Sequence, residues 1–219
     1  MSAASERYVP AAGRAPLTRG YDLVLALTMR EGSWRPVLAE RVLGGLPGGA
    51  TVVDVGAGTG TLAIELAAGR PDVAVIGVDG DPHVQSLAQR KRGAERVSWH
   101  PGLAGELPLA DASADRVVMS LLLHHLDRDA KRAALAEARR VLRPGGELHI
   151  ADWGRAHDPL MRAAFGVLQL IDGLSGTRDH VAGLLPQLIV DAGFGAVERY
   201  GRVRTGWGSL ELLKAHSPR

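Results

Sequence analysis

The sequence contains no cysteine, and this absence removes several kinds of chemistry. Without a thiol, the chain can form no disulfide, use no thiolate nucleophile and offer no sulfur ligand to a metal. Long apolar runs are lacking too, since no segment has the charge-free stretch of a membrane span. Residues 1–20 also lack the apolar centre of a secretory signal. We therefore expect a cytoplasmic protein without a membrane span.

The sequence also has little excess of either charge. Its 26 basic and 24 acidic side chains leave a formal net charge of +2. Such a balance lacks the large excess of positive charge that is typical of nucleic-acid-binding proteins, so no nucleic-acid partner is expected. The 219 residues are 46% hydrophobic and include 28 glycines, which predicts one well-buried domain with many tight turns.

The order of sequence patterns predicts an α/β fold. Residues 1–16 are expected to form a flexible arm, and 17–46 two lid helices, interrupted near Gly32 and Pro36. Short β-branched runs then alternate with helical ones, which is typical of a parallel sheet covered by helices on both faces. The expected strands are 51–55, 73–78, 97–99, 116–122, 147–152, 196–203 and 209–214, and the expected helices after the lid are 61–68, 82–92, 127–142, 160–171 and 181–192.

The last two strands are joined by a glycine-rich turn and predict an antiparallel hairpin at the edge of the sheet. The predicted fold is therefore a doubly wound, mostly parallel seven-stranded sheet with N-terminal lid helices. We expect a single domain over 17–219, with a ligand-binding core at 50–155 and a cover over the site at 156–177.

A glycine run, VVDVGAGTGTLAIEL, joins the first strand to the next helix. Gly56, Gly58 and Gly60 lie in this turn, at the edge of an open parallel sheet where ligands bind. Glycines let a ligand approach the backbone and permit positive φ, although they can also serve the turn alone. A dinucleotide fingerprint would place its third glycine at position 61, where this chain has Thr61.

Two aspartates near this turn indicate the kind of ligand. Asp54 would repel a pyrophosphate at short range but would attract an ammonium or a sulfonium, which points to a cationic adenosyl cofactor and disfavours a nicotinamide-dependent oxidoreductase. Asp79 ends the second strand, where a carboxylate can accept hydrogen bonds from two ribose hydroxyls. The alternative is that Asp79 or Asp81 caps the next helix. We assign the ribose to Asp79 and the cap to Asp81.

With the segments GELPLADASADRVVMSLLLHHL and EARRVLRPGGELHIADW, the chain resembles the class I S-adenosylmethionine-dependent methyltransferases over about residues 50 to 155. It is similar to their small-molecule type, which includes quinone-pathway enzymes. The resemblance implies S-adenosylmethionine as cofactor and S-adenosylhomocysteine as product. It also implies cofactor contacts, with Gly56, Ala57 and Gly58 at the methionine moiety, Asp54 at its amino group, Asp79 and Gly80 at the ribose, Leu103 and Ala104 at the adenine, and Ser120 and Leu121 along the pocket.

One position departs from the family pattern. Leu103 stands where relatives often carry an aspartate that accepts from the adenine amino group. We therefore expect backbone and apolar contacts to the adenine, with Glu106 as an alternative acceptor.

The lid and the cover are expected to close the site. Tyr21, Arg30 and Trp34 belong to the expected lid, and Arg30 either pairs with the cofactor carboxylate or is a solvated surface arginine. The apolar stretch PLMRAAFGVLQLIDG lies where relatives build a substrate cover, which implies a hydrophobic acceptor. The alternative is plain core packing.

The expected chemistry needs little acid or base machinery, because a methyl group on a sulfonium is already activated. The enzyme must align a nucleophile and exclude water. His124 follows the fourth strand and is the candidate acid or base, with His125 beside it at the substrate, although a structural turn explains both. Asp152 and Trp153 end the fifth strand and are candidate substrate contacts; the alternative is a capped turn.

Several subclasses of methyltransferase are excluded by missing motifs. The site after the fourth strand reads SLLLHHL, without the Asn/Asp-Pro-Pro-aromatic motif of DNA amino-methyltransferases. No cluster of carboxylates suggests a metal. We expect in-line methyl transfer to O, N or C of a small, partly apolar acceptor by a monomer or homodimer. The alternative is a binding or scaffold protein that keeps the cofactor pocket without methyl transfer.

Overall fold

The computed structural model describes residues 28–172 and 174–219. The expected flexible arm at 1–16 and the first part of the lid at 17–27, with Tyr21, lie outside the described residues. Within the described ranges, none of the helices combines the length and the apolar character needed to cross a bilayer.

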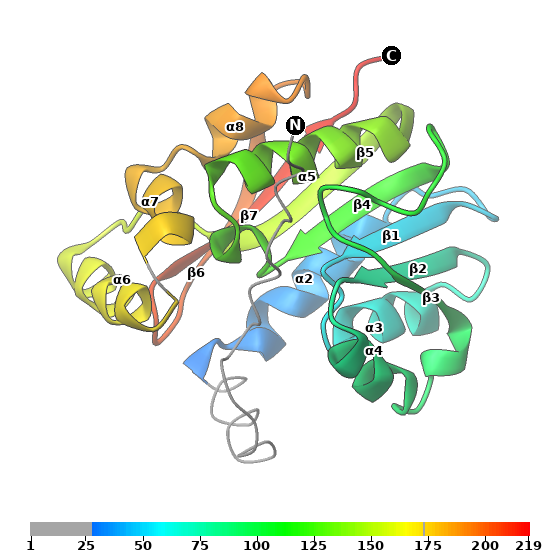
Figure 1. Ribbon diagram of the computed structural model, residues 1–219, viewed down its shortest axis with the longest axis horizontal. Helices are drawn as coiled ribbons and strands as arrows, with labels where there is room; N and C mark the ends of the chain where they lie inside the picture. The colour runs from blue at the N-terminus through cyan, green and yellow to red at the C-terminus, as the bar shows by residue number, and fades with distance from the viewer. Residues whose placement is uncertain (1–27, 173) are drawn as a thin grey trace, which may run out of the picture.

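The centre of the fold is a seven-stranded sheet with the strand order β3-β2-β1-β4-β5-β7-β6. The strands are β1 (Thr51–Val55), β2 (Ala74–Asp79), β3 (Val97–Pro101), β4 (Ala114–Ser120), β5 (Leu142–Trp153), β6 (Glu198–Arg204) and β7 (Ser209–His216). The first five pair in parallel, and β7 pairs antiparallel with both β5 and β6 (Figure 1). The strand order reverses between β1 and β4, so a ligand-binding crevice is expected at their carboxyl ends. The predicted fold class is confirmed.

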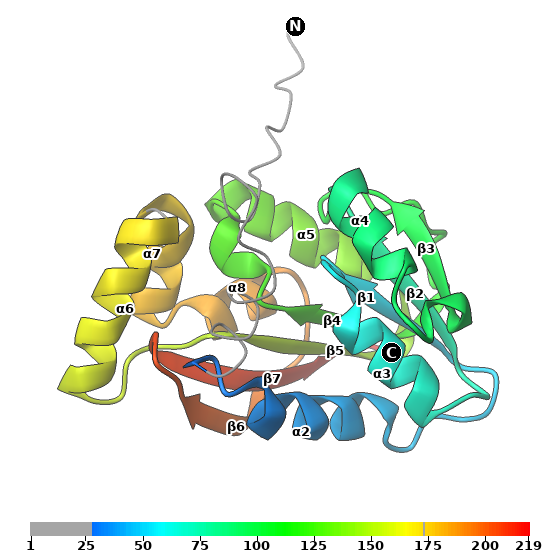
Figure 2. The ribbon, with the colours of Figure 1, turned by 90° about the horizontal axis from the view of Figure 1, so that it is seen from below.

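Helices cover both faces of the sheet (Figure 2). One face packs against α2 (Glu31–Leu43) and α3 (Thr61–Gly69), and the other against α5 (Arg128–Val141) and α8 (Leu185–Asp191). The remaining helical elements are α4 (Pro82–Gln89), α6 (Pro159–Asp172), α7 (Leu174–Ala182) and the short 3-10 turns η1 (Ala94–Arg96) and η2 (Leu123–His125). Because β1 is covered on both faces, Val52, Val53 and Val55 are all fully buried, which explains why its sequence is a continuous apolar run.

Two helix predictions were wrong in detail. The helix expected at 181–192 is divided, because α7 ends before Gly183, which has φ of 71°, and α8 starts at Leu185. Conversely, α2 runs through Gly32 and Pro36, where an interruption was expected. Pro36, the sixth residue of α2, lacks the N–H that would donate to the Gly32 carbonyl oxygen, and the burial of Trp34, Leu38 and Val42 along the helix offsets this loss.

Candidate active site

The turn after β1 brings three glycines to the carboxyl edge of the sheet. Gly56, Gly58 and Gly60 have φ of 70°, 56° and 76°, values that residues with a side chain rarely adopt. A side chain on Gly60 would collide with the ring of Trp99 in β3, whereas one on Gly58 would meet only a backbone oxygen 4.0 Å away. Packing therefore requires the glycine at position 60, whereas at position 58 only the positive φ favours glycine.

Asp54 of β1 is an unusual group because it is buried without a well-formed hydrogen bond. It is 1% exposed, and neither of its carboxylate oxygens has a partner with ordinary hydrogen-bond geometry. The Ala63 N–H and the Arg35 guanidinium favour its ionised form only in part. Burial, and next the negative charge of Asp79, raise the pKa of Asp54 from 3.8 to about 7. Buried carboxylates are almost always paired. The unused hydrogen-bonding capacity of the Asp54 carboxylate therefore points to a ligand that brings a hydrogen-bond donor or a positive charge.

Asp79 joins the end of β2 to the glycine turn. Its Oδ2 atom accepts from the Gly58 N–H at 2.7 Å, and its Oδ1 atom accepts from the Asp81 N–H at 2.8 Å. Because each carboxylate oxygen has two lone pairs, both retain capacity for ribose hydroxyls. Asp81 caps α4, accepting from the N–H groups of His83 and Val84 at 2.8 and 3.3 Å. The assignment of the cap to Asp81 is confirmed.

A cleft of about 190 Å³ opens between the glycine turn and α2. Five of the predicted cofactor residues line it, namely Asp54, Gly56, Ala57, Ser120 and Leu121. Trp34 and Arg35 of α2 also line it. The structure thus brings residues from β1, β4 and the lid to one cleft at the point where the strand order reverses.

The arginine in this cleft is Arg35 of α2, which the sequence reasoning missed. It forms ion pairs with Glu31, one turn earlier, and with Glu65 of α3 at 3.6 Å. Arg30, the predicted partner of the cofactor carboxylate, is exposed and donates to the carbonyl oxygen of Arg204 at 3.3 Å. It does not line the cleft.

The loop after β3, predicted to meet the adenine, is tied to the end of β2. The Gly102 N–H donates to the carbonyl oxygen of Asp79 at 3.1 Å. Leu103 pairs with Glu106 in a short antiparallel bridge. Leu103 and Ala104 are half-buried, and Glu106 is exposed. The loop therefore lies next to the predicted ribose site.

A second polar cluster lies at the ends of β4 and β5. Asp152, 1% exposed, accepts from the N–H groups of Leu123 and Trp153 at 2.8 and 2.7 Å. Its Oδ1 atom lies 2.8 Å from His124 Nδ1 and 4.0 Å from His180 Nδ1. Burial alone would raise the pKa of Asp152, but His124, His180 and these hydrogen bonds outweigh it and hold the pKa below its ordinary value. The ionised carboxylate accepts a hydrogen bond from His124 Nδ1 and so fixes the orientation of the ring.

The other predicted substrate residues surround His124. The His125 ring lies 3.9 Å from the His124 ring, and burial, then the charge of His124, lower the pKa of His125 to about 3. Trp153 is 1% exposed, and its indole N–H has no partner. Its ring lies edge-on to His124 at 6.0 Å and to Phe165 of α6 at 5.7 Å. The segment predicted as a cover therefore packs directly against this cluster. Among residues 28–172 and 174–219, no group of acidic or histidine side chains is arranged to hold a metal.

Comparison with known proteins decides the family. A family model described as a methyltransferase domain matches residues 52–146. A ubiquinone/menaquinone biosynthesis C-methyltransferase from Paracoccus denitrificans is 30% identical over 172 residues, which cover 68% of this chain and 68% of that protein. The chain belongs to the class I S-adenosylmethionine-dependent methyltransferases.

This methyltransferase is also similar to a second curated protein and to a solved structure. A demethylmenaquinone methyltransferase from Deinococcus radiodurans is 36% identical over 156 residues, which cover 69% of this chain and 63% of that protein. The chain thus spans somewhat less than two thirds of that relative. A phosphoethanolamine N-methyltransferase from Haemonchus contortus, solved with S-adenosylhomocysteine, has a TM-score of 0.68 at 16% identity and covers 85% of this chain and 53% of that one. This likeness confirms the fold.

Proposed function

We propose that this methyltransferase binds S-adenosylmethionine beside Asp54 and transfers its methyl group to a ring carbon of a quinol. The observation that carries the proposal is the buried carboxylate of Asp54, which lacks a well-formed hydrogen bond, in the cleft that Gly56 and Ala57 also line. The positively charged amino group of the cofactor satisfies this carboxylate, whereas a pyrophosphate would bring a like charge. The quinol class is supported by the names of the relatives, which act on demethylmenaquinone or in quinone biosynthesis.

One further residue of the cleft, and two predicted contacts outside its lining, fit the other parts of the cofactor. Arg35 is placed to meet the carboxylate with its planar guanidinium, exchanging its present partners Glu31 and Glu65 for the ligand. Asp79 retains the lone pairs to accept from the ribose hydroxyls. The loop at Leu103 supplies an apolar surface for the adenine.

The chemistry then depends on the acceptor and on water exclusion. S-Adenosylmethionine supplies a methyl group that its sulfonium already activates for in-line displacement. His124 Nε2 takes the proton of a quinol hydroxyl, while Asp152 holds Nδ1 and stabilises the imidazolium. The resulting oxyanion shifts electron density onto the neighbouring ring carbon. That carbon would form the new bond to the methyl group as the bond to sulfur breaks with its electrons on sulfur. The ring hydrogen would leave to solvent as a proton, and the His124 imidazolium would return its proton to the ring oxygen.

Methyl transfer is tested with cofactor labelled on the methyl group and a short-chain demethylmenaquinol. We expect label in the quinol and none in the matched oxidised quinone, which has no hydroxyl proton to give up. Phenols and amines serve as alternative acceptors. If the protein binds S-adenosylhomocysteine tightly but transfers label to none of them, the binding or scaffold function replaces this proposal.

A further inference from the structure

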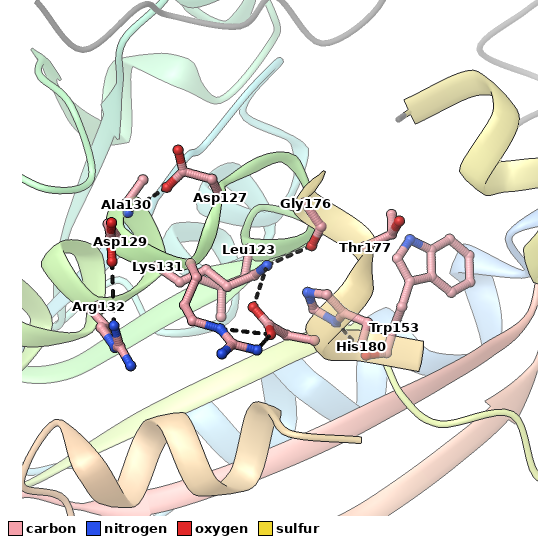
Figure 3. Close-up of polar contacts among 12 residues, drawn as sticks. Leu123, Asp127, Asp129, Ala130, Lys131, Arg132, Trp153, Gly176, Thr177 and His180 are labelled. Atoms are coloured by element: carbon pink, nitrogen blue, oxygen red, sulfur yellow. Dashed lines mark hydrogen bonds and ion pairs between the residues drawn. The ribbon is translucent and has the colours of Figure 1, made fainter. Parts of the chain in front are cut away.

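A buried lysine of α5 contacts α7 (Figure 3). Lys131 of α5 is fully buried, and its Nζ atom donates to the Gly176 carbonyl oxygen at 2.5 Å and to Asp179 Oδ2 at 3.3 Å. Burial lowers the pKa of Lys131, and the charge of Asp179 opposes this shift. A buried charge is costly unless it is paired and hydrogen-bonded. Position 131 therefore tolerates a lysine only because α7 supplies both partners.

Asp179 connects this buried contact to the surface. Its Oδ1 atom accepts from Arg128 Nε at 3.0 Å and also from the second guanidinium nitrogen. Burial raises the pKa of Asp179, but Arg128 and Lys131 outweigh it and hold the pKa below its ordinary value. Two cations of α5 therefore fix one carboxylate of α7.

The same helix lies directly against the proposed catalytic turn. A side chain at Gly176 would collide with the carbonyl oxygen of His124, so α7 approaches η2 as closely as backbones can. His180, one turn after Gly176, is fully buried, and its Nδ1–H donates to the Trp153 carbonyl oxygen at 2.6 Å. This contact also brings His180 Nδ1 to 4.0 Å from Asp152. The position of α7 thus determines how the His124–Asp152 pair is covered.

We propose that Lys131 is a positioning residue for methyl transfer: its ammonium seats α7 on the turn that carries His124, so that His180 closes over the His124–Asp152 pair. The inference rests on the proposed function, because it assigns Lys131 to the acceptor side of that reaction. Lys131 touches neither the cleft beside Asp54 nor its lining residues. Its loss should therefore affect the transfer step and leave cofactor binding intact.

The test compares Lys131→Met with Lys214→Met. Methionine keeps the length and apolar stem of lysine and removes only the charge and its donors. Lys214 of β7 is also paired with carboxylates, at 3.3 Å from Glu198 and 4.0 Å from Glu147, away from α7. Turnover of the short-chain demethylmenaquinol is measured per S-adenosylhomocysteine-binding site, with the sites counted by titration calorimetry. Hydrogen exchange of α7 amides is measured in parallel.

We expect Lys131→Met to lower turnover per site by about 10- to 100-fold, because small misplacements of catalytic groups cost that much. Its affinity for S-adenosylhomocysteine should stay within about twofold, since distant sites are nearly independent. Amides of α7 should exchange faster, and Lys214→Met should match the parent in all three measurements. A merely structural role would reduce the number of binding sites and leave turnover per site unchanged, which would overturn the proposal.

Failure of the proposed function is a separate result. If the parent transfers no label to the quinol, the proposed acceptor is wrong. Hydrogen exchange alone then tests whether Lys131 holds α7 in its position. Unchanged exchange of α7 in Lys131→Met would then overturn the inference, and faster exchange in α7 but not in α3 would support it.

Discussion

Cofactor binding should release a proton from Asp54. Burial and the charge of Asp79 raise its pKa to about 7 in the free protein, so the carboxyl is largely protonated below that pH. A cationic amino group beside it favours the ionised form. Binding must then expel the proton at low pH. The affinity for S-adenosylhomocysteine should fall about tenfold for each pH unit below about 7 and be nearly constant from there to about pH 8, above which the ligand's own amino group loses its proton.

The same shift makes the free protein less stable than it would be without Asp54. The pKa rises from 3.8 in the unfolded chain to about 7 in the fold, which corresponds to about 4 kcal/mol. Because the folded state disfavours the charged form, this cost is absent below about pH 4 and grows until about pH 7. The free energy of unfolding of Asp54→Asn, relative to the parent, should therefore rise by about 4 kcal/mol across that range.

Titration calorimetry with S-adenosylhomocysteine tests the proton release directly. At about pH 6, binding is measured in two buffers with different protonation enthalpies, so that the difference counts released protons. The parent should release close to one proton, and Asp54→Asn should release none. A pH-independent affinity in the parent, or the same proton count in both proteins, would refute the reasoning.

Further substitutions test the remaining parts of the site. Gly60→Ala should lower the free energy of unfolding by about 1 to 3 kcal/mol in chemical denaturation, because it opposes a positive φ and meets Trp99; an unchanged midpoint would contradict that packing. Arg35→Met should weaken S-adenosylhomocysteine about tenfold by calorimetry; an unchanged affinity would leave the ligand carboxylate without its proposed partner. His124→Asn and Asp152→Asn should each lower turnover of the quinol by about 10²- to 10⁴-fold with cofactor affinity retained; full turnover in either would remove the proposed base.

Much of the fold could be predicted because strong local patterns specify it. The continuous apolar run of β1, the three glycines after it and Asp79 at the end of β2 follow from requirements that act within a few residues. The division of the 181–192 helix at Gly183 was missed, because the apolar spacing continues across the break. Local pattern therefore gave the order of elements better than their boundaries.

The residues of the site that were not predicted from the sequence depend on contacts between distant segments. Arg35 was overlooked in favour of Arg30, because Gly32 and Pro36 obscured the helical phase that turns position 35 toward the cleft. Lys131 looks in sequence like any exposed charge on an amphipathic helix, and only its contacts with Asp179, 48 residues away, show why it is buried. Such pairings are set by tertiary packing, which residue spacing along the chain does not encode.

The central claim is that the cleft beside Asp54 takes a positively charged adenosyl cofactor and rejects a diphosphate. A competition titration of the purified protein with S-adenosylhomocysteine and NAD tests it most directly. The account predicts one binding site for S-adenosylhomocysteine per chain, with an affinity that excess NAD leaves unchanged. Saturable binding of NAD together with no response to S-adenosylhomocysteine would contradict it.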